Sequence, residues 1–411
     1  MQPTTGVATG RGRLPLVALL IANTVSLIGS SLTLIALPWF VLQTTGSATR
    51  TGLTGFAVAL PGFLVGIFGG TIVDRLGYRR SSVIADVVSG IGIGLVPTLY
   101  VTAGLPFGLL LGLVFVGSLL AIPGFTARRS LLPELAKASG VRLERVNALF
   151  ESNNQLAMLL GPPIAGLLIV WVGASTVLWL DAASFVCSAA TVGLLVPALR
   201  GHRAPAAPGR YRDQLVEGLR FLLHEPLLRD MALALALIQG LEEPIFAVVL
   251  PVYARQILGS ATDLGLMASA LGLGALAGGA AYGAVGYRVP RRMLWFGAYL
   301  LTPGIYWALA ARPAFPLLLA IMVVLGFASG PITPLAVTIR HERIPPALRG
   351  RVFAATSAIG RIAMPPGIAL SGLAIARLGF RPTVVILAAA VQLAALGMLA
   401  VPALRRMDRP V

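Results

Sequence analysis

Ionisable residues lie inside long apolar stretches of this sequence, where a charge is costly and usually serves a function, and five of them could bind a proton or a charged substrate. They are Glu151, Asp181, Glu242, Glu243 and Arg361. A carboxylate surrounded by hydrocarbon favours its protonated form and can exchange a proton near neutral pH. An arginine at such a depth needs a carboxylate partner or an anionic substrate. These residues therefore favour the binding of protons or of a charged substrate.

The sequence Glu242-Glu243-Pro244 lies late in an apolar run that follows Arg229. Counted from Arg229, Glu242 lies about 20 Å along a helix. Adjacent helical residues diverge by about 100°, so at most one of the two carboxylates faces a central cavity. Pro244 cannot donate a backbone hydrogen bond and can kink the helix. Two interpretations stay open: proton or cation-substrate binding, and a structural or outer-gate role.

The other embedded acids lie at different depths. Glu151 is about 9 Å from Arg145, which suits either a gate or the transport cavity. Asp181 is about 10 Å from the outer end of its segment, where a hydrogen-bonded structural role competes with binding. Asp86 lies near the start of its segment and is expected to pair with cytoplasmic arginines. Amide side chains that could either add hydrogen bonds in a cavity or pack between helices are Asn23, Asn154, Gln155 and Gln239.

Apolar segments long enough to cross a membrane must position these residues. The chain is 57% hydrophobic and only 11% charged, with a mean hydropathy of +0.87, whereas soluble proteins have about 25% charged residues. The first apolar run lacks a signal-peptide cleavage site and is interpreted as a spanning helix. We predict an all-α membrane protein with twelve spans of roughly 20 residues or more. The predicted spans are residues 14–42, 51–73, 80–102, 105–127, 146–170, 175–198, 229–253, 262–285, 291–311, 314–338, 350–376 and 381–403.

The basic residues are distributed unevenly between the two sides of these spans. Of 32 Lys and Arg residues, 26 fall in the segments on the side of the N-terminus, five in the opposite loops, and Arg361 within a span. This bias predicts that both termini lie in the cytoplasm. The formal net charge of +17 is therefore explained by topology, and nucleic-acid binding is not expected.

The two halves of the chain repeat one another. The segment GTIVDRLGYRR, residues 70–80, recurs as GAAYGAVGYRV, residues 279–289. A second match pairs residues 145–173 with 351–379 and gives Arg361, about 15 Å into its helix, Gln155 as a counterpart. We expect parallel six-helix halves, residues 1–198 and 229–411. The linker, 199–228, is expected to contain an amphipathic helix on the membrane or the bundle, unless it is only a solvated connector.

The first of these motifs carries a family resemblance. Residues Gly70, Asp74, Arg75, Gly77 and Arg79 resemble the motif G-x-x-x-D-R-x-G-x-R of the major facilitator superfamily, between helices 2 and 3. Tyr78 departs from the basic residue frequent there. The segments 26–48, 147–168 and 348–354 are similar to the drug-efflux branch that includes macrolide and siderophore exporters. The resemblance implies two pseudo-symmetric six-helix bundles.

The resemblance also implies a role for this motif. In the family it latches the two halves together on the cytoplasmic side when the transporter faces outward. Asp74 would then lie near the N-terminal end of helix 11, around Gly350 and Arg351, where a carboxylate is favoured. Arg75 and Arg79 would hold Asp74 and nearby carbonyl groups. The alternative is that these arginines only anchor the loop on the cytoplasmic side.

We therefore expect a secondary transporter that works by alternating access in the plasma membrane. The favoured function is proton-coupled export of an amphiphilic drug-like compound or secondary metabolite. The alternatives are an importer or lipid transporter on the same fold and, in a different class, a non-transporting receptor. No catalytic constellation, metal site or Walker motif is recognisable, so we predict no enzyme activity and no cofactor, with the proton gradient as the driving force. The expected partners are the lipid bilayer, a small-molecule substrate and protons, and the protein is expected to be a monomer.

Overall fold

The computed structural model describes residues 12–68, 76–197, 211–405 and 407–408, and these residues are helical with no strand among them. Eleven helical runs in this part of the chain are long and apolar enough to cross a membrane. The helix α2 (Ala48–Phe68) takes the place of the second predicted span and adjoins residues 69–75, which lie outside the described part. The all-α prediction is confirmed.

The N-terminal half is built from helices that follow one another with short connections. Its helices are α1 (Leu14–Thr45), α2, α4 (Tyr78–Thr102), α5 (Phe107–Leu119), α6 (Ala121–Ser139), α7 (Leu143–Val172) and α8 (Ala174–Leu195). The helix α6 corrects one expectation, because residues 128–139, expected in a cytoplasmic loop, continue the helical run that starts at Phe107. Three leucines of α6 are buried in a small apolar core, which explains why the helix continues: Leu131, Leu132 and Leu135.

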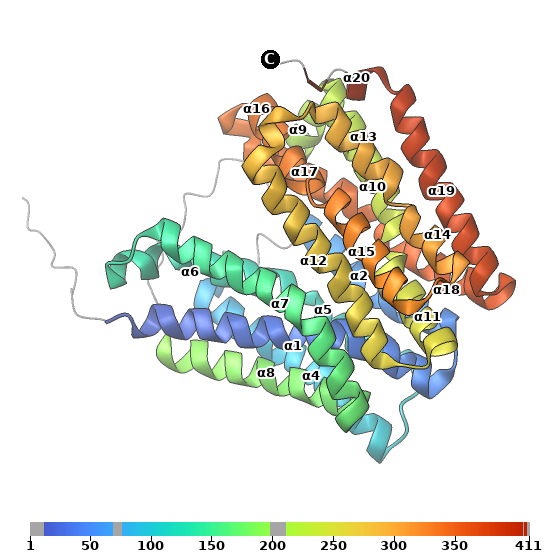
Figure 1. The fold of residues 1–411 in the computed structure, drawn as a ribbon. Coiled ribbons are helices and arrows are strands. Elements are labelled where there is room, and N and C mark those ends of the chain that lie inside the picture. The colour runs from blue at the N-terminus through green and yellow to red at the C-terminus, as the bar shows by residue number, and fades with distance from the viewer. Residues whose placement is uncertain (1–11, 69–75, 198–210, 406, 409–411) are drawn as a thin grey trace, which may run out of the picture.

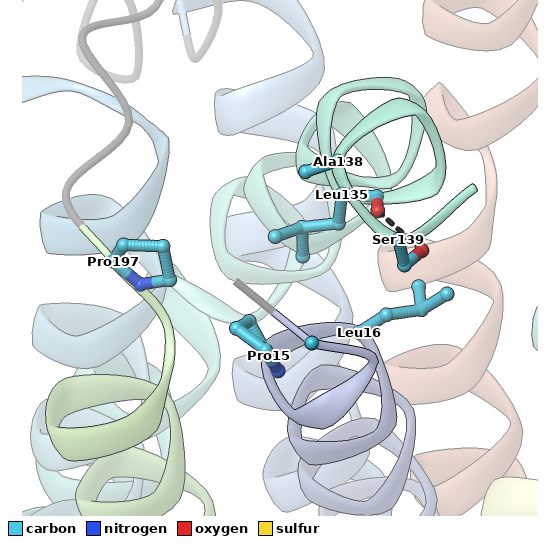
Figure 2. A pocket seen from close by; sticks show the side chains of 7 residues that line it. Pro15, Leu16, Leu135, Ala138, Ser139 and Pro197 are labelled. Carbon is cyan, nitrogen blue, oxygen red and sulfur yellow. Dashed lines mark hydrogen bonds between the residues drawn. The ribbon is translucent and has the colours of Figure 1, made fainter. Parts of the chain in front are cut away.

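The last turn of α6 packs against the ends of two other helices. Figure 2 shows Leu135, Ala138 and Ser139 beside Pro15 and Leu16 of α1, with Pro197 after α8. The Ser139 hydroxyl donates to the carbonyl of Leu135 at 2.6 Å, within the helix. The pocket between these side chains has a volume of about 30 Å³ and is almost entirely apolar. It is a packing gap at the end of the N-terminal half.

The C-terminal half has the same plan with more interrupted helices. Its first span, which corresponds to the seventh span predicted for the chain, comprises α10 (Pro226–Glu242), the π-helical turn η1 (Ile245–Val249), α11 (Leu250–Tyr253) and the π-helical turn η2 (Ala254–Leu258). The remaining helices are α12 (Ala261–Val285), α13 (Arg291–Leu301), α14 (Gly304–Ala311), α15 (Phe315–Ser329), α16 (Ile332–Arg343), α17 (Arg349–Ile362), α18 (Met364–Leu378), α19 (Phe380–Ala400) and α20 (Pro402–Arg405). A short 3₁₀ turn follows α12 and another precedes α17.

A helix of the linker, α9 (Tyr211–His224), lies against α17 of the C-terminal half. Glu217 of α9 forms an ion pair with Arg351 of α17 at 2.5 Å. Leu222 is buried, whereas half of the Leu223 side chain is exposed. The helix therefore contacts the bundle through one apolar side, while part of its predicted apolar face stays uncovered.

The two halves are inclined to one another (Figure 1). At the linker end, where α9 and α16 lie, the halves are apart. At the opposite, distal end, α2 packs against α18 and α7 packs against α12. In the described part of the chain the halves therefore pack together at the distal end, and their helices diverge toward the linker end.

Two close crossings of backbone form this distal closure. A Cβ atom added at Gly52 of α2 would lie 3.0 Å from the Cα of Gly372 in α18. On the other side, a Cβ added at Gly166 of α7 would lie 2.6 Å from the carbonyl oxygen of Ala261 at the start of α12. Such distances leave no room for a side chain. Glycine permits this close approach of helices, as in other membrane-helix interfaces.

The two crossings are related by the internal repeat. The sequence Gly-Ser-Ala-Thr occurs at 46–49 and again at 259–262. In both copies the glycine has a positive φ, 64° at Gly46 and 72° at Gly259. The serine hydroxyl then caps the next helix by accepting from a backbone N–H, that of Arg50 or of Asp263. The matching turns place Gly52 and Gly265 at equivalent positions in α2 and α12.

Candidate transport site

The helix α10 carries polar side chains on two different faces. Gln239 and Glu243 are four residues apart and share the face toward α17, where the Gln239 Oε1 atom would lie 3.0 Å from a Cβ added at Gly360. Glu242 is turned by about 100° from Glu243 and lies near the tyrosines of α13 and α14. The two adjacent carboxylates thus point in different directions, although the charges of both act on Tyr306.

Arg361 of α17 lies between the two halves. Its side chain is exposed, and a Cβ added at Gly62 of α2 would lie 3.3 Å from its Nη1 atom. Its charge acts on the carboxylate of Glu243. Within the described part of the chain, no carboxylate lies within ion-pair distance of Arg361. The Arg361 guanidinium therefore lies near Gly62 of the other half and near the Glu243 carboxylate, but it forms no ion pair with that carboxylate.

The surroundings of Glu242 are of a different kind. The Tyr306 hydroxyl of α14 donates to the carbonyl oxygen of Leu241 at 2.5 Å and lies 3.5 Å from that of Glu242. The Glu242 charge also acts on the hydroxyl of Tyr299 in α13. These tyrosines belong to the core of the C-terminal half. Glu242 therefore faces the interior of its own bundle.

The helix changes its geometry directly after these residues. Pro244 follows Glu243, and the next five residues form the π-helical turn Ile245–Val249. Proline removes one backbone donor, and a π-helical turn is a common way to accommodate such an interruption. The sequence predicted a disturbance at Pro244, but the second π-helical turn, Ala254–Leu258, had no comparable signal.

In the N-terminal half, α7 presents a polar row. Glu151 and Gln155 are exposed, and the Gln155 amide donates to the Glu151 carboxylate at 3.3 Å. Asn154 is half-buried beside them. Asn153 instead turns toward α1, where its amide donates to the Thr24 hydroxyl at 2.7 Å. Glu151, Asn154 and Gln155 are thus available on a helix that contacts the other half.

Asp181 is held between α8 and α1. Its carboxylate accepts hydrogen bonds from Thr33 of α1 and from Ser184 of its own helix, and its side chain is buried. Two hydroxyl donors satisfy part of a buried carboxylate. Of the two roles considered for Asp181, the hydrogen-bonded structural role agrees better with this position inside one bundle.

A second buried network in this half includes Asn23 and Asp86. Arg128 of α6 forms an ion pair with Asp86 at 2.7 Å, and its Nε donates to the Asn23 amide oxygen at 3.2 Å. The Ser188 hydroxyl donates to the other Asp86 oxygen at 2.6 Å. Asn23 is fully buried, so in this conformation its side chain packs between helices, the alternative to a cavity position. The arginine that pairs with Asp86 thus lies inside the bundle.

The sequence analysis missed the role of Arg128, although a signal was present. Arg128 lies three, four and seven residues before Leu131, Leu132 and Leu135, and this spacing places it on the buried face of an amphipathic helix. Arg129, one residue later, is exposed. The assignment of both arginines to a loop hid this difference.

Comparison with known proteins decides the family. A sequence profile described as the Major Facilitator Superfamily matches this chain twice, over residues 19–242 and 232–410. The chain belongs to this superfamily. It is therefore a transporter and not an enzyme, as the sequence predicted.

Individual relatives of this superfamily member cover most of its length. The multidrug efflux pump Tap of Mycolicibacterium fortuitum is 32% identical over 408 residues, which are 97% of this chain and 98% of that protein. Macrolide efflux protein A of Streptococcus pyogenes is 24% identical over 86% of this chain and 88% of its own. A solved structure of a bacterial homologue of the human lysosomal transporter Spinster, inward-facing and unoccupied, has a TM-score of 0.75 at 15% identity and covers 96% of this chain and 98% of its own. That structure supports the superfamily fold.

The superfamily motif is only partly described. Gly70, Asp74 and Arg75 lie outside the described residues. Gly77 has a φ of 80° and precedes α4, a backbone conformation that glycine adopts readily. Arg79 donates to the carbonyl of Gly193 in α8. Arg79 therefore holds a nearby carbonyl inside its own half. Among the described residues, no group of histidine, cysteine and acidic side chains could hold a metal ion.

Proposed function

We propose that this superfamily member exports amphiphilic, drug-like compounds in exchange for protons. The observation that carries the export direction is its similarity to the multidrug efflux pump of Mycolicibacterium fortuitum, which extends over nearly the full length of both chains. The macrolide efflux protein of Streptococcus pyogenes supports the same class of substrate at lower identity. No cofactor is required in this scheme, because the proton gradient supplies the energy.

The linker end faces the cytoplasm in this proposal. The bias of basic residues toward the segments of this end supports the orientation, with both termini inside the cell and the protein in the plasma membrane. The described conformation is then open to the cytoplasm, ready to take up substrate. Residues 1–198 and 229–411 act as the two rocking units, 199–228 joins them, and a monomer suffices for the cycle.

Glu243 and Arg361 are the coupling residues of this cycle. When Glu243 is charged it attracts Arg361, and when it is protonated the attraction is lost and Arg361 is released toward α2 or the substrate. Because Arg361 lies beside Gly62 of the other half, a change in its position affects the contact between the halves. Glu151, Asn154, Gln155 and Gln239 contribute hydrogen bonds to the bound compound.

The coupling is tested with purified protein in vesicles. Glu243→Gln removes the charge with little change in shape, so transport of a fluorescent amphiphilic dye should no longer accelerate when a pH gradient is applied. Dye binding at equal pH should change by less than a factor of a few. Glu144→Gln is the matched control, because Glu144 is an exposed carboxylate in a surface ion pair with Arg142.

Two outcomes would argue against this scheme. Full gradient-driven transport by Glu243→Gln would remove Glu243 from the coupling and direct attention to Glu151. Dye accumulation in vesicles of opposite orientation, with the pH gradient reversed, would indicate an importer. A loss of transport in both glutamine variants would point to damage that is unrelated to coupling.

A further inference from the structure

Four buried side-chain polar atoms among the described residues of the C-terminal half have no hydrogen-bond partner. One is the Oε1 of Gln239, on the face toward α17, and the other three are the indole Nε1 of Trp295, the hydroxyl of Tyr299 and the Oε1 of Glu242. Trp295 is 1% exposed and Tyr299 is 2% exposed. The two aromatic rings belong to the same face of α13 and pack edge to face with centroids 5.0 Å apart. Two neighbouring side chains of α13 thus carry unpartnered polar atoms, and the charge of Glu242 on α10 acts on one of them, Tyr299.

Leaving these groups dry would be costly. A buried polar group without a hydrogen-bond partner lowers the stability of the fold by about 1–3 kcal/mol, and by more if it is charged. Tyr306 shows how the same bundle satisfies a buried hydroxyl, because it is 1% exposed and donates to the Leu241 carbonyl at 2.5 Å. Tyr299 is buried to nearly the same extent, but its hydroxyl forms no such hydrogen bond. The difference between the two tyrosines indicates a missing polar partner at Tyr299.

We propose that Glu242, Tyr299 and Trp295 hold a small group of water molecules inside the C-terminal half. The chemistry of the three groups selects the ligand. The indole N–H only donates, the carboxylate accepts, and the hydroxyl does both. A metal ion would be repelled by the indole donor, whereas water can accept from Trp295 and donate to Glu242. Buried waters bind in this way where about three polar partners converge.

The water site gives Glu242 a polar connection toward the linker end. The groups that interact electrostatically with Glu242 or Tyr299 are Glu243 on the same helix, Arg340 of α16, whose charge acts on Tyr299, and Tyr306, whose hydroxyl is already bonded to the Leu241 carbonyl. Water between Glu242 and Tyr299 would let a proton leave the carboxylate without crossing the space between the halves. This role rests on the proposed proton coupling and adds Glu242 to it as the group that passes on the proton of the adjacent Glu243, but the water site itself does not depend on that coupling.

The site is tested by X-ray radiolysis of the purified full chain in water labelled with ¹⁸O, followed by mass spectrometry. Radicals formed from a bound water oxidise the side chains next to it, whereas a dry buried side chain reacts slowly. Tyr299 should therefore incorporate ¹⁸O several-fold faster than Tyr306, the matched tyrosine of the same span. Trp295 should be oxidised together with Tyr299. The measurement needs no substrate and no gradient, so it is independent of the proposed export.

Variants determine whether Glu242 holds the water. Glu242→Leu should slow the labelling of Tyr299 and Trp295 to the rate of Tyr306, whereas Glu242→Gln, which can still bind water, should not. If Glu242→Leu does not fold, Tyr299→Phe provides the same test, because it should slow the labelling of Trp295. Equal rates at Tyr299 and Tyr306 in the unaltered protein, or unchanged labelling in Glu242→Leu, would overturn the proposal.

Discussion

At the scale of single residues, the ion pair of Arg128 and Asp86 shows how a charge is kept inside the N-terminal half. Both side chains are almost fully buried; the Arg128 Nε donates to Asn23, and Ser188 donates to the Asp86 carboxylate. Burying an ion pair costs desolvation energy that the attraction often only balances. The pair is therefore better understood as a fixed link between α4 and α6 than as a large net source of stability.

Removing one partner of this pair should be much worse than removing both. Arg128→Met leaves Asp86 buried and uncompensated, so we expect a loss of about 3–5 kcal/mol in unfolding free energy. Arg129→Met is the control, since Arg129 is exposed and its loss should cost less than about 0.5 kcal/mol. Thermal unfolding in detergent measures both. The double variant Arg128→Met with Asp86→Leu should recover most of the loss, and a double variant less stable than either single one would contradict this account.

Sequence reasoning at this scale succeeded where helix geometry alone decides. The angle between neighbouring residues predicted that Glu242 and Glu243 would not both face a central cavity, and the structure places Glu242 near Tyr299 and Glu243 near Arg361. Helix geometry could not say that the charge of Glu242 would act on Tyr299, because the two residues belong to helices far apart in the chain. Asn23 was considered for the cavity on its residue type alone. In the structure it is buried and accepts a hydrogen bond from Arg128. Hydropathy had placed this arginine outside the bundle, so the contact could not be predicted.

At the scale of elements, the crossings of α2 with α18 and of α7 with α12 close the distal end. A Cβ at Gly372 would lie 2.6 Å from the carbonyl oxygen of Ala48 and 2.9 Å from the Cα of Gly52. The atoms in the way belong to the backbone, which cannot move aside as a flexible side chain can. A side chain at either glycine must therefore push the two halves apart at this end.

A bulky residue at this crossing should shift the population of conformations. We expect Gly372→Leu to disfavour the state closed at the distal end, because it clashes only where α2 and α18 meet. Spin labels at Arg50 and Arg377, in a protein with Cys187→Ala, should report longer distances than in the parent. Gly397→Leu on α19 is the control, since a Cβ there meets nothing within 4 Å. An unchanged distance distribution for Gly372→Leu would mean that the crossing does not limit closure.

Hydropathy and charge predicted the spans well, because an apolar solvent imposes their length. Their ends were less predictable. The helix α6 continues to Ser139 because its leucines find a core, a tertiary effect that local polarity hides. The repeated Gly-Ser-Ala-Thr turn was visible in the sequence but was not recognised, since the comparison followed charged motifs. It is the clearer marker of the equivalence between α2 and α12.

At the scale of the whole molecule, the described conformation is open at the linker end. In such a state the motif that contains Asp74 and the start of α17 need not touch, which agrees with a latch that closes only in the opposite state. The helix α9 lies on α17 and is paired to it through Arg351. The partner expected for Asp74 is therefore already engaged with the linker when this end is open.

The latch predicts a directional shift. If Asp74 holds the halves together at the linker end, Asp74→Asn weakens a charge–dipole contact worth about 0.3–1 kcal/mol when exposed and about 2 kcal/mol when partly buried. The ratio of closed to open linker ends should then fall by a few-fold to about thirty-fold. Distances between spin labels at Lys137 and Ala347 measure this ratio.

The repeat supplies the control for this experiment. Gly283 occupies the position equivalent to Asp74 and has no charge, so Gly283→Asn should not produce the same shift. If Asp74→Asn leaves the distance distribution unchanged, Asp74 only anchors or packs the loop, and the latch must be abandoned.

The paired glycine crossings also constrain how this protein can evolve. Gly52 faces Gly372 across one seam, and Gly265 faces the backbone of Pro162 and Pro163 within α7, one turn before Gly166, across the other. Each seam joins one residue position from the first half to one from the second, so the space available at either position is set by the size of its partner. Glycine at 52 and at 372 should therefore be retained among descendants, because a side chain at either position meets the backbone of the other helix. Elsewhere the duplicated halves can diverge, but along these two lines both must keep small residues.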